Sequence, residues 1–409
     1  MIMAFLHNAA LYVIPFLCVL TLVVTIHELG HFAVARWLGV AVDRFSIGFG
    51  RPILHWIDRA GVEWRVGWIP LGGYVRFAGD GEASSSVPDA EALDRLRTEI
   101  VAREGAGGER KYFHFKPVWA RALVVAAGPA ANFVLAILIF ATLLTAVGET
   151  VVRPRVGTVL PNSPAARAGF MPGDLVDAID GRPIADFMEL KQYVALRAGV
   201  PIRFGVQRGG RELVLTATPE RRSETDRLTG GSARLGVLGL GSSNLPTDIS
   251  RRRYTPVEAV IGGTRRTADI VETTVFYLGR LVRGLESGDQ LGGPLRIAAT
   301  SRAAARAGAE GATDLGGKLF GGAVALLSLA GVLSVGIGFM NLLPVPVLDG
   351  GHLLFYAYEA AARRPLGARV QAAGYRVGLA LLLALMLFAT WNDLQQLPVF
   401  SKILGRLFS

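Results

Sequence analysis

Long stretches without a charged residue are the feature that most constrains how this chain can fold. Ala9–Ile26 and Ala122–Val147 contain no Asp, Glu, Lys or Arg. About 20 apolar residues in a helix cross the hydrocarbon core of a bilayer. Charged residues make up only 19% of the chain, whereas soluble domains carry about 25%. The pattern excludes a plain soluble enzyme, a disordered chain and a fibrous repeat.

We therefore predict an α-helical membrane protein with four transmembrane helices, at about residues 9–38, 122–147, 319–348 and 372–391. The last is long enough only if it starts near Ala372, with Arg376 reaching to the interface. No Lys or Arg precedes the first apolar run, and no A-x-A-like cleavage site follows it. We interpret this run as a retained helix and not as a signal peptide.

The basic residues of the short loops predict the orientation. The loop between the third and fourth spans has no acidic residue after Glu359 and carries Arg363, Arg364, Arg369 and Arg376. Positive loops stay in the cytoplasm. This places residues 39–121 inside, and both termini and residues 148–318 outside. The net charge of +10 then reflects orientation and contact with anionic lipid, so no nucleic-acid partner is needed.

A short motif at the end of the first span predicts the chemistry. His27-Glu28-Leu29-Gly30-His31 is an H-E-x-x-H sequence. On a helix, the two imidazoles lie on one face and can bind one Zn²⁺, and Glu28 stands beside them as a general base. Two ordinary helix histidines are the alternative. Ionisable residues are costly at membrane depth, however, which favours a functional site.

Two histidines and a water leave one protein ligand missing from a catalytic zinc site. Asp349 is the best candidate, since it ends a long apolar span and follows two prolines that break the helix. His352, one turn later, is a rival ligand. An ordinary helix N-cap is the alternative role for Asp349.

These features together resemble the site-2 protease family of intramembrane zinc metalloproteases (peptidase family M50), and in particular its bacterial RseP type. The resemblance extends over nearly the whole chain. The matching segments are His27–His31, Arg44–Gly50, Ile69–Val75, Ala127–Phe133 and Asn341–Gly351.

The resemblance implies zinc held by His27, His31 and Asp349, with Glu28 as the catalytic base. It also implies that three residues help to shape the substrate cleft: Asn341, Pro344 and Pro346. A hydrogen bond between helices is an equally good reading of Asn341.

Residues 42–78 have strand-like composition and include the turn signal Gly72-Gly73. A strand edge beside zinc could bind an unwound substrate as an added strand, with Gly72 and Gly73 in substrate binding. The family likeness implies that the region is a membrane-associated β-hairpin. The alternative is a hairpin that only anchors at the interface through Trp56, Trp64 and Trp68.

Residues 151–222 predict an inserted small α/β domain, and their S-P-A-A…P-G-D pattern resembles a PDZ domain. Enterobacterial members of the RseP type carry two PDZ domains in tandem. A peptide-binding gate or size filter is favoured over a passive spacer. We interpret 223–318 as linker and amphipathic external segment. Within it, Arg234–Leu240 either completes this domain or is a remnant strand, Pro256–Gly284 is an amphipathic helix, and 292–297 is a turn. Residues 1–150 and 319–409 are then the two halves of the protease core.

The resemblance implies an intramembrane zinc metalloendopeptidase of a bacterial inner membrane, with its zinc site near the cytoplasmic side. Its partners would be the lipid bilayer and a transmembrane substrate already cut by a site-1 protease. The substrate would be an anti-sigma-factor-like regulator or a remnant signal peptide. A non-proteolytic zinc-containing adaptor is one alternative. A transporter is disfavoured, because no inverted repeat of hydropathy is present.

Overall fold

The computed structural model describes residues 2–79, 90–225, 232–243, 245–285, 292–310 and 313–395. The chain divides into two compact units. The helical unit comprises Met1–Phe140, Gly263–Val271 and Gly293–Asp393, and the α/β unit comprises Ala141–Gly262, Glu272–Gly292 and Leu394–Ser409.

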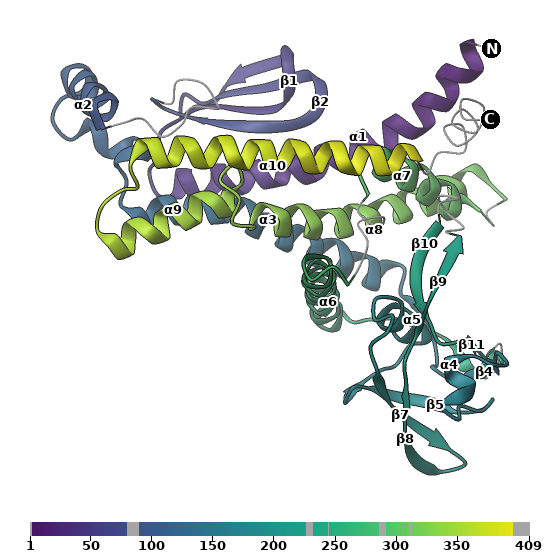
Figure 1. The fold of residues 1–409 in the computed structure, drawn as a ribbon. Helices are drawn as coiled ribbons and strands as arrows, with labels where there is room; N and C mark the ends of the chain where they lie inside the picture. The colour runs from purple at the N-terminus through teal and green to yellow at the C-terminus, as the bar shows by residue number, and fades with distance from the viewer. Residues whose placement is uncertain are drawn as a thin grey trace, which may run out of the picture. The chain divides into compact units, whose positions relative to one another are not determined.

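Four helices are long and apolar enough to cross a membrane, as predicted. They are α1 (Ile2–Trp37, of which Ile14–Trp37 is the candidate span), α3 (Val118–Ala146), α8 (Leu315–Asn341) and α10 (Ala368–Gln395). Figure 1 shows α1 and α8 side by side in the helical unit.

Small residues allow these helices to approach closely. A Cβ at Gly30 of α1 would overlap the Ala127 carbonyl of α3, and a Cβ at Gly331 of α8 would lie 2.7 Å from the Phe140 ring. Lipid supplies no hydrophobic drive for helix association, so close backbone packing stabilises the bundle instead.

The helix formed by the third apolar stretch ends before the predicted boundary at 348. Helix α8 stops at Asn341, and α9 (Asp349–Ala362) begins seven positions after Leu342. Pro344 and Pro346 lack the N–H that a helix needs. Gly350 and Gly351 bring α9 against this broken segment, because a Cβ at Gly351 would overlap the Pro346 Cα.

A long antiparallel hairpin follows α1. Strands β1 (Val42–Ile57) and β2 (Glu63–Phe77) pair with several bulges, with Phe45 opposite Val75 and Trp56 opposite Trp64. The Phe45 ring packs against Phe32 of α1 at 5.3 Å between centroids, and the Thr21 hydroxyl of α1 donates to the Pro70 carbonyl at 2.7 Å. The hairpin is therefore fixed to the helix that carries the H-E-x-x-H motif. Helix α2 (Ala90–Glu104) comes next in the chain.

The α/β unit has a four-stranded sheet of order β6-β5-β7-β8. The elements around its core are β4 (Val156–Val159), α4 (Pro164–Arg167), β5 (Leu175–Ile179), β6 (Arg182–Pro183), α5 (Phe187–Ala195), β7 (Ile202–Arg208) and β8 (Arg211–Ala217). Phe204 is fully buried at the centre, with Phe170 edge-on at 5.4 Å.

Strands continue past residue 222, where the sequence suggests a linker. β9 (Glu220–Thr225) pairs with β10 (Ser232–Val237), and β12 (Ile249–Arg252) pairs with β3 (Glu149–Val152). β11 (Leu240–Ser242) pairs with β4, and Leu238 lies in the same core as Phe204. β11 and β12 pair with segments about 80 to 100 residues earlier, so the Gly- and Ser-rich composition of 223–250 does not reveal those pairings, whereas β9 and β10 pair locally.

Two further helices follow. α6 (Pro256–Val282) begins with a capping box between Thr255 and Glu258, and it is the predicted amphipathic helix. The predicted turn at 292–297 is wrong, because Pro294 opens helix α7 (Pro294–Ala309). Proline suits the first helical position, and Asp393 of α10 accepts hydrogen bonds from the N–H groups of Gly293 and Arg296 at 3.0 and 2.9 Å.

Candidate metal centre

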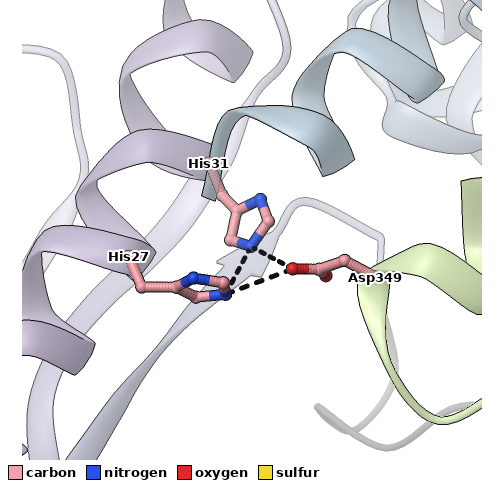
Figure 2. Close-up of side chains that lie close together, drawn as sticks. All are labelled: His27, His31 and Asp349. Carbon is pink, nitrogen blue, oxygen red and sulfur yellow. Dashed lines mark hydrogen bonds and ion pairs between the residues drawn. The ribbon is translucent and has the colours of Figure 1, made fainter. Parts of the chain in front are cut away.

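Three of the residues predicted to bind metal converge in the helical unit. His27 and His31 lie one turn apart on α1, and Asp349 is the first residue of α9. Asp349 Oδ2 lies 3.2 Å from His27 Nε2 and 3.5 Å from His31 Nε2, and the two Nε2 atoms are 3.2 Å apart. Figure 2 shows all three atoms facing one point.

This arrangement fits zinc. Four ligands placed tetrahedrally at about 2.0–2.1 Å from Zn²⁺ stand about 3.3 Å from one another, which matches the three separations. Asp349 Oδ2 is buried and has no hydrogen-bond partner among the residues described. A buried carboxylate oxygen without a donor is costly, and a cation at this point would remove the cost.

Helix α3 contacts the Nδ1 atom of both imidazoles. His31 Nδ1 lies 2.9 Å from the Val124 carbonyl oxygen, and His27 Nδ1 lies 3.2 Å from the side-chain amide of Asn132. A carbonyl only accepts hydrogen bonds, so His31 Nδ1 carries the proton and Nε2 keeps its lone pair for a metal.

Gly128 of α3 is a site residue that the sequence alone does not single out. A Cβ there would lie 2.9 Å from His27 Cε1 and would overlap the His31 ring. In the sequence, the Ala127–Phe133 segment that holds Gly128 is only one part of the family resemblance. Which face of α3 meets α1 depends on tertiary packing, and no local spacing signals it.

Glu28 faces the hairpin. A Cβ at Gly73 would lie 3.5 Å from Glu28 Cγ, whereas Gly72 lies against the Phe49 ring and Val24. The structure therefore brings Gly73 of the predicted substrate-binding pair directly beside the predicted base.

The other predicted residues are spread around the broken segment. Asn341 is the half-buried last residue of α8, and Pro344 is exposed. Pro346 packs on α10, where a Cβ at Gly378 would meet its ring at 3.2 Å.

His352, the rival ligand, turns away from the cluster. Its Nδ1 lies 3.3 Å from the Tyr375 hydroxyl of α10. Among the described residues, the group able to hold a metal consists of His27, His31 and Asp349. Asp349 is therefore the better third ligand.

Comparison with known proteins defines the class. The model of peptidase family M50 matches residues 15–385. The chain is 50% identical to "Metalloprotease MmpA" of Caulobacter vibrioides over 97% of this chain and 98% of that protein. It is 43% identical to a putative zinc metalloprotease of Agrobacterium fabrum, over 94% of this chain and 96% of the relative. A putative zinc metalloprotease of Mesorhizobium japonicum is 42% identical, over 93% of this chain and 98% of the relative.

The chain belongs to peptidase family M50, and it is a multi-pass membrane protein. Its cofactor is zinc, in agreement with the donor set.

Proposed function

We propose that this metalloprotease is an intramembrane zinc endopeptidase that cleaves transmembrane segments of single-pass membrane proteins. The observation that carries the proposal is the depth of the site. His27 and His31 lie inside the candidate span Ile14–Trp37, and Asp349 joins them from the break after α8. A zinc site built into a spanning helix suits a substrate that is itself in the bilayer.

The residues have distinct roles in this proposal. His27, His31 and Asp349 hold zinc, which when bound polarises the scissile carbonyl and lowers the pKa of a bound water. Glu28 takes the proton of the attacking water and passes it to the leaving amine.

The hairpin supports a means of presenting the substrate. A transmembrane helix hides its peptide carbonyls in its own hydrogen bonds, so it must unwind before attack. An unwound segment can pair with a strand edge by backbone hydrogen bonds. Gly73 places β2 beside Glu28, and Asn341 and Pro344 lie at the end of α8 and in the break after it, where an extended segment could bind.

The α/β unit supports a gating role. We propose that it is PDZ-like, as the pattern in 151–222 suggests; its four-stranded sheet and the pairing of β11 with β4 support this. We propose that it excludes substrates until a site-1 protease has removed their outer domain. The arginine-rich loop between the third and fourth spans supports a location of this unit on the periplasmic side of a bacterial inner membrane. The substrates would be anti-sigma-factor-like regulators or remnant signal peptides.

The experiment compares purified wild type with Glu28→Gln on a tagged single-pass transmembrane segment that lacks its outer domain. We expect cleavage to fall at least 10²-fold, with the zinc content unchanged, because Glu28 is not a ligand. Equal cleavage by the two proteins would contradict the proposal.

A non-proteolytic adaptor with structural zinc is the second candidate. Structural zinc sites are closed by four protein ligands, whereas three side chains converge among the residues described here, which favours catalysis. His31→Ala separates the two readings. We expect zinc and cleavage to be lost together, whereas an adaptor would show no cleavage even when loaded with zinc.

A further inference from the structure

We propose that Asn132 is the positioning residue for His27: its side-chain oxygen accepts a hydrogen bond from His27 Nδ1–H and so directs the Nε2 lone pair to zinc. This rests on the proposed function, since it assigns Nε2 of His27 as a zinc ligand.

Each of the two imidazoles needs a hydrogen-bond acceptor at Nδ1. An imidazole that binds metal through Nε2 carries its proton on Nδ1, and that N–H requires an acceptor. For His31 the acceptor is the Val124 main-chain carbonyl at 2.9 Å. For His27 the group at Nδ1 is the Asn132 carboxamide at 3.2 Å. Both groups belong to α3, so one helix orients both ligands.

The hydrogen bonds of Asn132 indicate which end of the amide faces His27. With Nδ2 toward the ring, His27 Nδ1 must accept, so its proton would sit on Nε2 and block metal binding. The two ends of a carboxamide are assigned from their partners. Turning the amide places Oδ1 on Nδ1–H and frees the Nε2 lone pair.

The position of Asn132 is firmly set by its surroundings. Its residue exposure is 0%. The Ser334 hydroxyl of α8 donates only to its main-chain carbonyl, at 2.8 Å, and not to the amide. A Cβ at Gly338 of α8 would lie 3.1 Å from the Asn132 Cβ. The amide therefore has little room to leave His27, as a positioning role requires.

The test measures zinc affinity of the full-length protein in detergent, by competition with a chelator, together with the absorption spectrum of the Co²⁺-substituted protein. Asn132→Leu removes the acceptor at similar volume, and we expect a 10- to 100-fold loss of zinc affinity. Asn132→Asp keeps an oxygen that can only accept, and we expect it to bind zinc at least tenfold more tightly than Asn132→Leu, with the tetrahedral cobalt spectrum of the wild type.

Ser334→Ala is the matched control, because it removes a buried hydrogen bond to Asn132 without touching the amide. We expect its zinc affinity to stay within about twofold of wild type. The proposal is overturned if Asn132→Leu binds zinc like the wild type, if Asn132→Asp loses as much affinity as Asn132→Leu, or if Ser334→Ala loses as much as either. If Asn132→Leu does not fold, the comparison of Asn132→Asp with wild type decides, since a tenfold loss there also overturns it.

Failure here is distinguishable from failure of the proposed function. Zinc binding that depends on Asn132 in a protein without proteolysis would refute the protease and leave the positioning role intact. Unchanged zinc affinity in Asn132→Leu would refute the positioning role and leave the proposed protease function intact.

Discussion

Two carboxylates, one in each unit, are buried under opposite conditions. Asp174 in the α/β unit has a fully buried side chain, and both of its oxygens are used. It accepts from Arg208 Nε at 2.7 Å, from Arg208 Nη2 at 2.8 Å and from the Met171 N–H at 2.9 Å. Asp349 in the helical unit has a buried Oδ2 that faces two imidazole nitrogens and has no hydrogen-bond partner among the described residues.

The difference separates a structural charge from a functional one. A paired and hydrogen-bonded carboxylate stabilises the fold only as long as its partners remain. An incompletely satisfied carboxylate is a cost that persists only when something else compensates for it, and zinc held as we propose would supply the compensation. The comparison therefore predicts that changes near Asp349 alter zinc binding and activity, whereas changes at Asp174 alter stability.

The largest expected effect is at Gly128, because the two imidazoles fill the space that a side chain at this position would need. Gly128→Ala puts a methyl group into the space of the His31 ring, so the ligands must move. We expect zinc affinity and cleavage to fall at least 100-fold, because a ligand displaced by 1 Å no longer meets the metal. Chelator competition and cleavage of a transmembrane substrate measure the two losses.

Gly336→Ala is the matched control, since a Cβ at this position of α8 meets nothing within 4 Å among the described residues. It should bind zinc like the wild type. If both variants lost zinc equally, general damage to the helices would explain the result, and the close approach at Gly128 would not.

The second effect is on the stability of the α/β unit. Asp174→Asn breaks the pair with Arg208, and we expect a loss of about 3 kcal/mol in the free energy of unfolding of this unit. Hydrogen exchange on the full-length protein measures it locally. Zinc affinity should not change, and a loss of zinc in this variant would contradict the division of roles between the two carboxylates.

The same pair predicts how this stability depends on pH. Burial raises the pKa of Asp174, but the Arg208 guanidinium and the Met171 N–H outweigh it, and that pKa lies below its ordinary 3.8. A lowered pKa stabilises the folded state fully above about pH 4, and the contribution is lost as the pH falls through the folded pKa. Asp174→Asn should lack this acid-dependent loss.

The predictable part of the metal centre is the part with local signals. The spacing of His27 and His31 follows from helix geometry, and Asp349 stands out because prolines and glycines surround an acid at the end of an apolar run. Gly128 and Asn132 carry no such signal. Their importance depends on which face of α3 meets α1, and that is decided by packing between segments about 100 residues apart.

The fold shows the same limit. Charge-free stretches predict the four long helices, since length and composition are sufficient for a span. The composition of 223–250 favours a loop, yet β11 pairs with β4 across about 80 residues of chain. The Gly-Gly-Pro at 292–294 is typical of a turn, but α7 starts there because Asp393, distant in sequence, accepts from its first N–H groups.

The smallest expected effect concerns an exposed pair in the same unit as Asp174. Arg182 Nη1 and Glu272 Oε2 are 2.8 Å apart, as close as the atoms of the buried pair, but their side chains are 63% and 47% exposed. Water and salt screen such a pair, so a double-mutant cycle with Arg182→Ala and Glu272→Ala should give a coupling below about 1 kcal/mol. The coupling should largely disappear in about 1 M salt. A coupling as large as the loss in Asp174→Asn would mean that contact distance, and not burial, determines how much a charge pair stabilises this protein.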